Sequence, residues 1–114
     1  MKEIILDTSF IISCVRQKID FFKEISLEGM KIFIPKQTIS ELKGLDARLA
    51  LNLVDANKEK FEVLTIPGKD ADEAIIRFAR KNPRVIVATL DQGLKKKLKN
   101  RKMVIRMKKK LEIF

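Results

Sequence analysis

The chain has 114 residues, of which 46% are hydrophobic and 35% charged, a composition typical of a folded domain with one modest core. It has no histidine and one cysteine, which excludes an internal disulfide, histidine-ligated zinc and catalysis by a histidine base. The net charge of +10 favours a polyanionic partner. The start of the chain lacks a signal-peptide pattern, and no apolar run reaches the roughly 20 residues of a membrane helix. We therefore expect a single domain over residues 1–114, cytoplasmic and without a membrane partner.

The first half of the chain alternates between strand and helix patterns. Pro35 should stop the second strand, and Asp20 and Asp46 are the predicted helix caps. The predicted elements are a strand at 3–7, a helix from Thr8 or Ser9 to about Arg16, a helix from Asp20 to near Gly29, a strand at 31–34, a helix at 38–45, and a helix after Asp46 in which Leu49, Leu53 and Ala56 share a face.

The second half continues the alternation. Asp70 and Glu73 have the spacing of a capping box at the start of a helix with a clear apolar stripe. The predicted elements are a strand at 61–66, a helix at 70–81, a strand at 84–89, a short basic helix at 93–100, a strand at 103–105 and an additional edge at 111–114. Strands that alternate with helices predict an α/β fold: a three-layer α/β/α sandwich around a mainly parallel five-stranded sheet.

Two carboxylates follow directly after strongly apolar strands. Asp7 ends Ile4-Ile5-Leu6, and Asp91 follows the strand that ends at Thr89. Ligand sites of parallel sheets lie outside the carboxyl ends of the strands, so both side chains are candidates for a shared site. The structural alternative is that each caps the following helix, although Thr8 and Ser9 could cap in place of Asp7.

Two further carboxylates lie on predicted helices. Asp72 borders the apolar face formed with Ile75 and Ala79, which would direct it towards the sheet; the alternative is an acid that only complements the helix dipole. Glu41 lies among Thr38, Ile39, Ser40 and Leu42, and the pattern alone fits a surface residue equally well. Carboxylates brought together repel one another unless they are protonated or bind a cation. Their oxygen ligands suit Mg²⁺ or Mn²⁺, which predicts metal-dependent phosphodiester chemistry.

The positive charge is concentrated near the C-terminus. The segment from Lys95 to Lys110 holds ten basic residues and no acid, so the remaining 15 basic residues balance the 15 acids of the chain. A block of one sign points to nucleic acid, while the structural alternative is a solvated helix face. The candidates for backbone contacts are Lys95, Lys96, Lys97, Lys99, Arg101 and Lys102.

Four segments in this order resemble the PIN-domain nucleases. They are Leu6-Asp7-Thr8-Ser9, Ile39-Ser40-Glu41-Leu42, Ala71-Asp72-Glu73-Ala74-Ile75 and Ala88-Thr89-Leu90-Asp91-Gln92-Gly93-Leu94. Within that family, Val87 to Asp91 and the following Leu94-Lys95-Lys96-Lys97-Leu98 look most like the archaeal and eukaryotic group that processes ribosomal RNA. One position departs from the pattern: many members have a second acid where this chain has Gly93.

The resemblance implies endonucleolytic cleavage of RNA in ribosomal RNA processing, with one or two Mg²⁺ or Mn²⁺ ions held by Asp7, Glu41, Asp72 and Asp91. Thr8, Ser9 and Thr89 would hydrogen-bond the ligand oxygens. Gly93 implies a weaker hold on a second ion. The resemblance also implies that the chain can form a homodimer.

Other readings of the same residues stay open. A toxin nuclease of the VapC type would share fold and chemistry but bind an antitoxin. A non-catalytic RNA-binding assembly factor with a degenerate site would fit the departure at Gly93. Phosphatases of the haloacid-dehalogenase type need Asp-x-Asp, which Ser9 breaks, and a response-regulator receiver fits poorly because the third strand ends in Ile66-Pro67. No Gly-x-x-x-x-Gly-Lys motif of a P-loop occurs.

Overall fold

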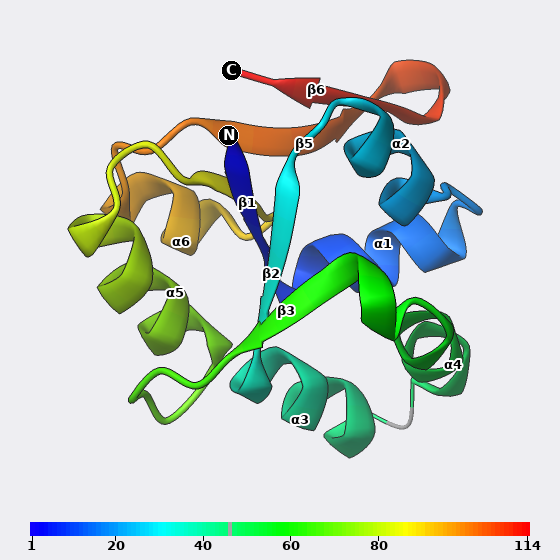
Figure 1. Ribbon diagram of the computed structural model, residues 1–114, viewed down its shortest axis with the longest axis horizontal. Coiled ribbons are helices and arrows are strands. Elements are labelled where there is room, and N and C mark those ends of the chain that lie inside the picture. The colour runs from blue at the N-terminus through cyan, green and yellow to red at the C-terminus, as the bar shows by residue number, and fades with distance from the viewer. Residues whose placement is uncertain (46) are drawn as a thin grey trace.

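A six-stranded sheet forms the centre of the protein (Figure 1). The computed structural model describes residues 1–45 and 47–114. The strand order is β3-β2-β1-β4-β5-β6, all parallel except β6, which runs antiparallel to β5. The strands are β1 (Glu3–Leu6), β2 (Lys31–Pro35), β3 (Phe61–Leu64), β4 (Ile86–Ala88), β5 (Lys102–Arg106) and β6 (Lys110–Ile113). The mainly parallel sheet is therefore confirmed, but the predicted number of five strands is wrong because the C-terminal edge pairs fully with β5.

Six helices and two short 3-10 turns connect the described strands. Asp20 and Asp70 cap their helices through their side chains, as predicted, and Gly29 has a φ of 72°, which suits the end of the second helix. The predicted cap at Asp46 lies outside the described residues. The helices are α1 (Thr8–Arg16), α2 (Phe21–Leu27), α3 (Lys36–Gly44), α4 (Arg48–Ala56), α5 (Ala71–Lys81) and α6 (Gln92–Lys97), and the 3-10 turns are Lys58–Lys60 and Met107–Lys109.

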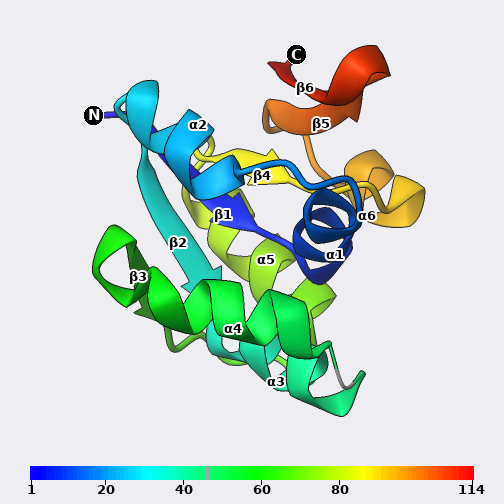
Figure 2. The same cartoon turned by 90° about the vertical axis from the view of Figure 1, so that its right-hand side faces the viewer.

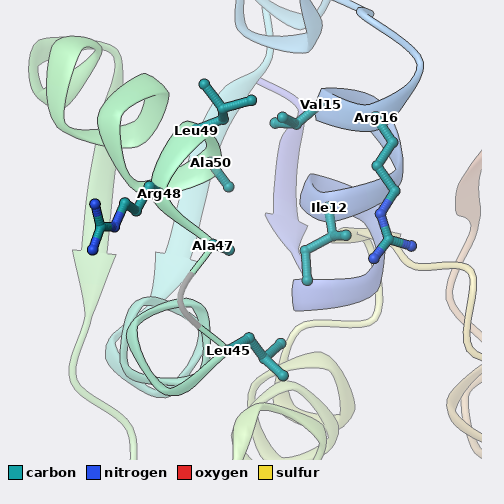
Figure 3. A pocket seen from close by; sticks show the side chains of 8 residues that line it. All are labelled: Ile12, Val15, Arg16, Leu45, Ala47, Arg48, Leu49 and Ala50. Atoms are coloured by element: carbon teal, nitrogen blue, oxygen red, sulfur yellow. The ribbon is translucent and has the colours of Figure 1, made fainter.

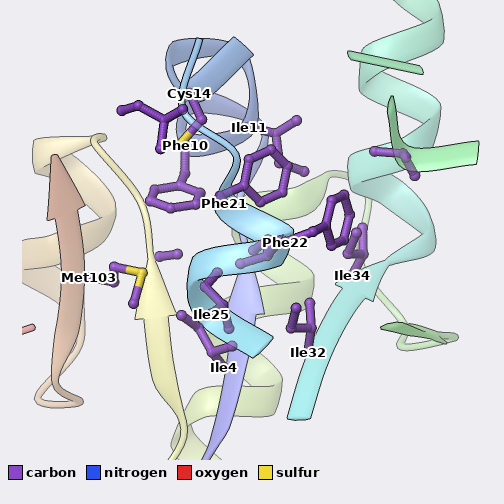
Figure 4. Close-up of a cluster of buried hydrophobic side chains, with 14 of the residues drawn as sticks. Ile4, Phe10, Ile11, Cys14, Phe21, Phe22, Ile25, Ile32, Ile34 and Met103 are labelled. Atoms are coloured by element: carbon purple, nitrogen blue, oxygen red, sulfur yellow. The ribbon is translucent and has the colours of Figure 1, made fainter. Parts of the chain in front are cut away.

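One face of the sheet carries the larger part of the core. Strand residues such as Ile4, Leu6 and Ile32 pack against α1 to α4. Phe21 and Phe22 are fully buried in this cluster (Figure 4). Figure 2 shows α1, α2 and α4 in front of the sheet and α5 behind it, so helices cover both faces and the predicted three-layer arrangement is confirmed.

Among the described residues, α5 and α6 are the helices that cover the opposite face. Ile5 and Val87 point to this side, because successive residues of a strand alternate between the two faces. They meet Ile75 of α5 and Leu94 of α6. The predicted basic helix at 93–100 ends at Lys97, so the cations after it lie on an extended segment.

The buried face of α4 differs from the predicted one. Ala50 and Val54 are buried, whereas Leu49 is 75% exposed and Ala56 is also exposed. The sequence of α4 contains two apolar stripes that are offset by one residue. The stripe with Ala50 and Val54 is the one that packs against α3 and α1. Leu49 is thereby left on the surface.

The sheet has its topological switch point at β1, which pairs with β2 on one side and with β4 on the other. Leu6 is in register with Ala88, so the residues after them, Asp7 and Thr89, emerge side by side. Crevices of this kind are where parallel α/β folds bind ligands. Within the described residues, no helix combines the length and the hydropathy that crossing a membrane would require.

Candidate active site

Asp7 lies at the switch point and is only 4% exposed. It occupies the cap position of α1, but its side chain makes no capping hydrogen bond. Its Oδ2 instead accepts hydrogen bonds from Thr89 Oγ1 at 2.7 Å and from Ser9 Oγ at 2.9 Å. Burial raises the pKa of the Asp7 carboxyl, and the two hydroxyls oppose that rise by stabilising the charge. Packing alone does not explain a carboxyl group buried in this position.

Ser9 and Thr89 connect the ends of β1 and β4. Besides binding Asp7, the Ser9 hydroxyl accepts a hydrogen bond from the backbone N–H of Leu90 at 3.0 Å. The Thr89 hydroxyl accepts one from the N–H of Asp91 at 3.1 Å. The hydroxyls therefore orient the Asp7 carboxylate and fix the loop that carries Asp91.

Glu41 joins three helices through its two carboxylate oxygens. Oε1 accepts a hydrogen bond from Thr8 Oγ1 at 2.6 Å, and Oε2 accepts one from the backbone N–H of Ala71 at 2.7 Å. Thr8 begins α1 and Ala71 begins α5, so Glu41 of α3 meets the positive ends of two helix dipoles. It is thus held beside the other carboxylates rather than on the open surface.

Asp72, in the first turn of α5, faces the same place. Burial raises the pKa of its carboxyl, and the charges of Asp7, Asp91, Asp70 and Glu41 raise it further. Carboxylates from four separate parts of the chain therefore lie close enough to repel one another. The charges of Asp7, Glu41 and Asp91 thus all act on Asp72, and their role as one metal site stays a prediction.

Asp91 caps a helix, and its role in the site stays a prediction. Its Oδ1 caps α6 by accepting a hydrogen bond from the N–H of Leu94 at 3.0 Å, as the structural alternative expected. It is also near enough to Asp72 to raise the pKa of that residue. A Cβ atom at Gly93 would lie 3.1 Å from Asp91 Oδ1, so a larger residue there would crowd this oxygen.

The chemistry of these side chains fits a divalent metal ion. Carboxylate oxygens are the ligands that Mg²⁺ and Mn²⁺ prefer, and a cation would relieve the repulsion that raises the pKa of Asp72. In the parts of the chain that the structure describes, no three acidic side chains already stand in a ligating arrangement. The fit therefore rests on the donor atoms and their mutual repulsion.

The predicted RNA contacts occupy different environments. Lys96, Lys97, Lys99 and Arg101 are exposed, whereas Lys95 is half-buried. The ammonium of Lys102 donates a hydrogen bond to the carbonyl of Leu98 at 2.5 Å. Burial lowers the pKa of Lys102, and the charge of Lys95 lowers it further. Lys102 thus terminates α6, and its contact with RNA stays a prediction.

The sequence reading missed Gln37, one turn before Glu41 on α3. Its Nε2 donates hydrogen bonds to the carbonyls of Ile66 at 2.6 Å and Gly68 at 3.0 Å, while its Oε1 is buried without a partner among the described residues. The loop is tight, because a Cβ atom at Gly68 would lie 2.8 Å from the backbone nitrogen of Ala74. Gln37 therefore fixes the approach of α5. The spacing of four residues to Glu41 was the available signal.

An apolar groove of about 470 Å³ lies elsewhere, between α1 and α4 (Figure 3). Its walls include Ile12, Val15 and Leu49, and none of the four carboxylates lines it. Leu45 at its rim is 62% exposed. Among the described residues that line the groove, Arg16 and Arg48 are the charged ones, and the groove is a surface distinct from the carboxylate site.

The fold and the arrangement of acids agree with a family assignment. Residues 4–110 match the family described as PIN like domain, and the chain belongs to this family. The chain is 36% identical to Ribonuclease VapC4 of Methanocaldococcus jannaschii, over all of its own length and 98% of that protein.

Two further relatives extend the comparison. The chain is 34% identical to the rRNA-processing protein fcf1 of Schizosaccharomyces pombe over 84% of its length, and it spans about half of that protein, 53%. The structure of the PIN domain endonuclease Utp24 superposes with a TM-score of 0.81 at 28% identity, covering 97% of this chain and 90% of that one. The resemblance to PIN domains expected from the four acidic segments is confirmed.

Proposed function

We propose that the protein is a metal-dependent endoribonuclease that cleaves RNA phosphodiester bonds, with Asp7, Glu41, Asp72 and Asp91 as its site. The observation that carries the proposal is the buried Asp7 carboxyl at the switch point, held by Ser9 and Thr89, with other carboxylates near enough to act on Asp72. Repulsion between these acids is poorly explained by stability, since separating them would relieve it. It is well explained by a cation.

Each residue has a task in this proposal. Asp7, Asp72 and Asp91 hold Mg²⁺ or Mn²⁺, and Glu41 completes the site while it fixes the starts of α1 and α5. When bound, the metal supplies a water of lowered pKa and neutralises charge on the phosphate, which makes hydrolysis accessible without histidine. Ser9 and Thr89 keep the Asp7 carboxyl oriented through hydrogen bonds to its Oδ2.

The substrate class follows from charge and from the names of the relatives. The exposed lysines near α6 offer contacts to phosphates, and such contacts position a strand without reading its sequence. Two relatives are named a ribonuclease and an rRNA-processing protein. We infer that this protein acts on ribosomal or pre-ribosomal RNA.

A specific observation keeps a toxin role as the second candidate. The groove between α1 and α4 has exposed leucines at its rim, which suits a protein partner such as an antitoxin. Expression in a heterologous host separates the two roles. Growth arrest that Asp7→Asn abolishes would favour the toxin, whereas normal growth would favour RNA processing.

The central test is the loss of metal-dependent cleavage. Asp7→Asn and Asp91→Asn should each lower Mn²⁺-dependent cleavage of a labelled RNA by about 100-fold or more, since each removes a charged ligand. Mn²⁺ should raise the melting temperature of the wild type but not of Asp7→Asn, which gives a second measurement independent of turnover. Asp55→Asn, on the exposed side of α4, is the matched control. Full activity of both site variants would refute the assignment.

A further inference from the structure

Two hollows adjoin each other between α5 and α6, on the face of the sheet away from α1. The first, about 490 Å³, begins at Asp72 and is lined by Arg77, Arg80 and Lys97. The second, about 510 Å³, is lined by Arg80, Lys97, Lys99 and the end of α5. Because Arg80 and Lys97 border both, the hollows form one depression, which we call the α5–α6 trough. It leads from the carboxylate site towards the end of α6.

The charge of the trough changes along its length. Near Asp72 the acids dominate, and Arg77 is paired with Glu73 at 3.2 Å. Farther on, Arg80, Lys97 and Lys99 are exposed, and no carboxylate of the described residues lies within ion-pairing distance of them. Cations gathered without counter-charges repel one another, and a polyanion relieves that repulsion.

The walls of the trough are fixed by buried hydrogen bonds. The Asn100 side chain is 7% exposed, and its amide donates to the carbonyls of Ala79, Asn82 and Val85 at 3.3, 3.1 and 3.0 Å. These bonds join the end of α5 to the segment that follows α6. The backbone that carries Lys97 and Lys99 is therefore fixed beside the end of α5 before any ligand arrives, which lowers the entropic cost of binding.

The length of the trough suits several phosphates. Asp72 and Arg80 are eight residues apart on one helix, roughly 12 Å along its axis at 1.5 Å per residue. Successive phosphates of a stacked strand are spaced about 3.4 Å along the helix axis. A strand with one phosphate at the carboxylates can therefore place a later one beside Arg80 and Lys97.

We propose that the α5–α6 trough binds the phosphate backbone of the RNA strand on one side of the cleaved bond, with Arg80 and Lys97 as its main contacts. This inference rests on the proposed function and deepens it. Arg80 lies outside the basic block of 95–110. Within that block, the proposal predicts that only the lysines that line the trough contact the RNA strand. Lys109 and Lys110 are exposed but line neither hollow.

The test measures binding rather than cleavage. Affinity for a labelled single-stranded RNA is measured by fluorescence anisotropy in EDTA, at several salt concentrations. The plot of log affinity against log salt should become shallower by about 1.4 in the double variant Arg80→Gln/Lys97→Gln, since each phosphate contact contributes about 0.7 for a single strand. Lys97→Arg should keep the slope of the wild type.

The matched control is Lys109→Gln/Lys110→Gln, which removes the same amount of charge from exposed lysines that line neither hollow. Its slope should change by less than that of one contact, about 0.7. Equal slopes for the two double variants would mean that RNA is attracted by the overall charge and not by the trough, which would overturn the proposal. An unchanged slope in Arg80→Gln/Lys97→Gln, or no RNA binding by the wild type, would also overturn it. A loss of affinity for polyglutamate but not for RNA would assign the trough to an acidic protein and also overturn it.

The two proposals fail separately. Cleavage that survives in Asp7→Asn refutes the nuclease site without affecting the binding data. Binding that ignores Arg80 and Lys97 refutes the trough while metal-dependent cleavage stands.

Discussion

The hydrophobic clusters on the two faces of the sheet differ in size. On one face, four helices bury a continuous cluster in which the rings of Phe10, Phe21, Phe22 and Phe61 contact one another in series at 4.5 to 5.8 Å. On the other face, α5 and α6 cover a smaller cluster with one aromatic pair, Phe33 and Phe78, at 5.5 Å. The carboxylate Asp72, the trough and the basic end of α6 all belong to the smaller side.

This difference separates stability from function. Buried apolar area is the main source of folding free energy, so the larger face should dominate stability. The smaller face can then keep acids near one another and cations without partners, both of which cost stability. Substitutions of matched residues on the two faces test this division.

The largest effect should come from Phe22→Ala. The side chain is fully buried between Phe21 and Phe61, and its loss leaves a cavity in the larger cluster. The free energy of unfolding should fall by about 3–5 kcal/mol, measured by urea denaturation. For a domain of this size, such a loss removes much of the total stability.

Phe78→Ala is the matched substitution on the smaller face. Phe78 is only half-buried and meets one ring, so its loss should cost about 1–3 kcal/mol, clearly less than the loss of Phe22. Equal costs for the two phenylalanines would contradict the division of labour between the faces.

An intermediate effect is expected from Asn100→Ala. Three buried or half-buried carbonyls would each lose a hydrogen bond, although those of Ala79 and Asn82 keep a backbone donor, and the free energy of unfolding should fall by about 1–3 kcal/mol. Asn57→Ala removes a similar bond, from Asn57 to the Leu53 carbonyl at 2.7 Å, at the more open end of α4. It should cost about 1 kcal/mol or less. If Asn57→Ala lowered the free energy of unfolding more than Asn100→Ala, the hydrogen bonds of Asn100 would matter less for stability than their geometry suggests.

Most of the fold could be predicted from the sequence because its signals are local. The capping side chains of Asp20 and Asp70 and the apolar stripe of α5 mark where helices begin and which side is buried. Pairing at the sheet edge and the choice of buried face on α4 depend on contacts distant in sequence. The sixth strand was therefore only suspected, and Leu49 was placed on the wrong side.

The site was predictable to a similar degree. Asp7 and Asp91 follow strands, so the topology of a parallel sheet alone brings them together. Glu41 needed the family resemblance, because its partners Thr8 and Ala71 are 33 and 30 residues away. The trough was not visible in the sequence, since Arg80 and Lys97 belong to different helices and only the packing of α5 beside α6 joins them.

The smallest effect concerns Cys14, which lies deep in the larger cluster. Burial raises the pKa of its thiol to about 12, from 9.0. The folded state therefore keeps a proton that the unfolded chain releases, so this contribution to stability is complete below pH 9 and declines as the pH rises towards 12. At pH 9.5 the loss of stability should be about 0.8 kcal/mol, and Cys14→Ala should not show it.

Iodoacetamide at that pH should modify the Cys14 thiol in urea but not in the native protein, as followed by mass spectrometry. Rapid modification of the native protein would mean that the four-helix face opens more readily than its packing indicates, and the contrast between the two faces would be weaker than the aromatic contacts suggest.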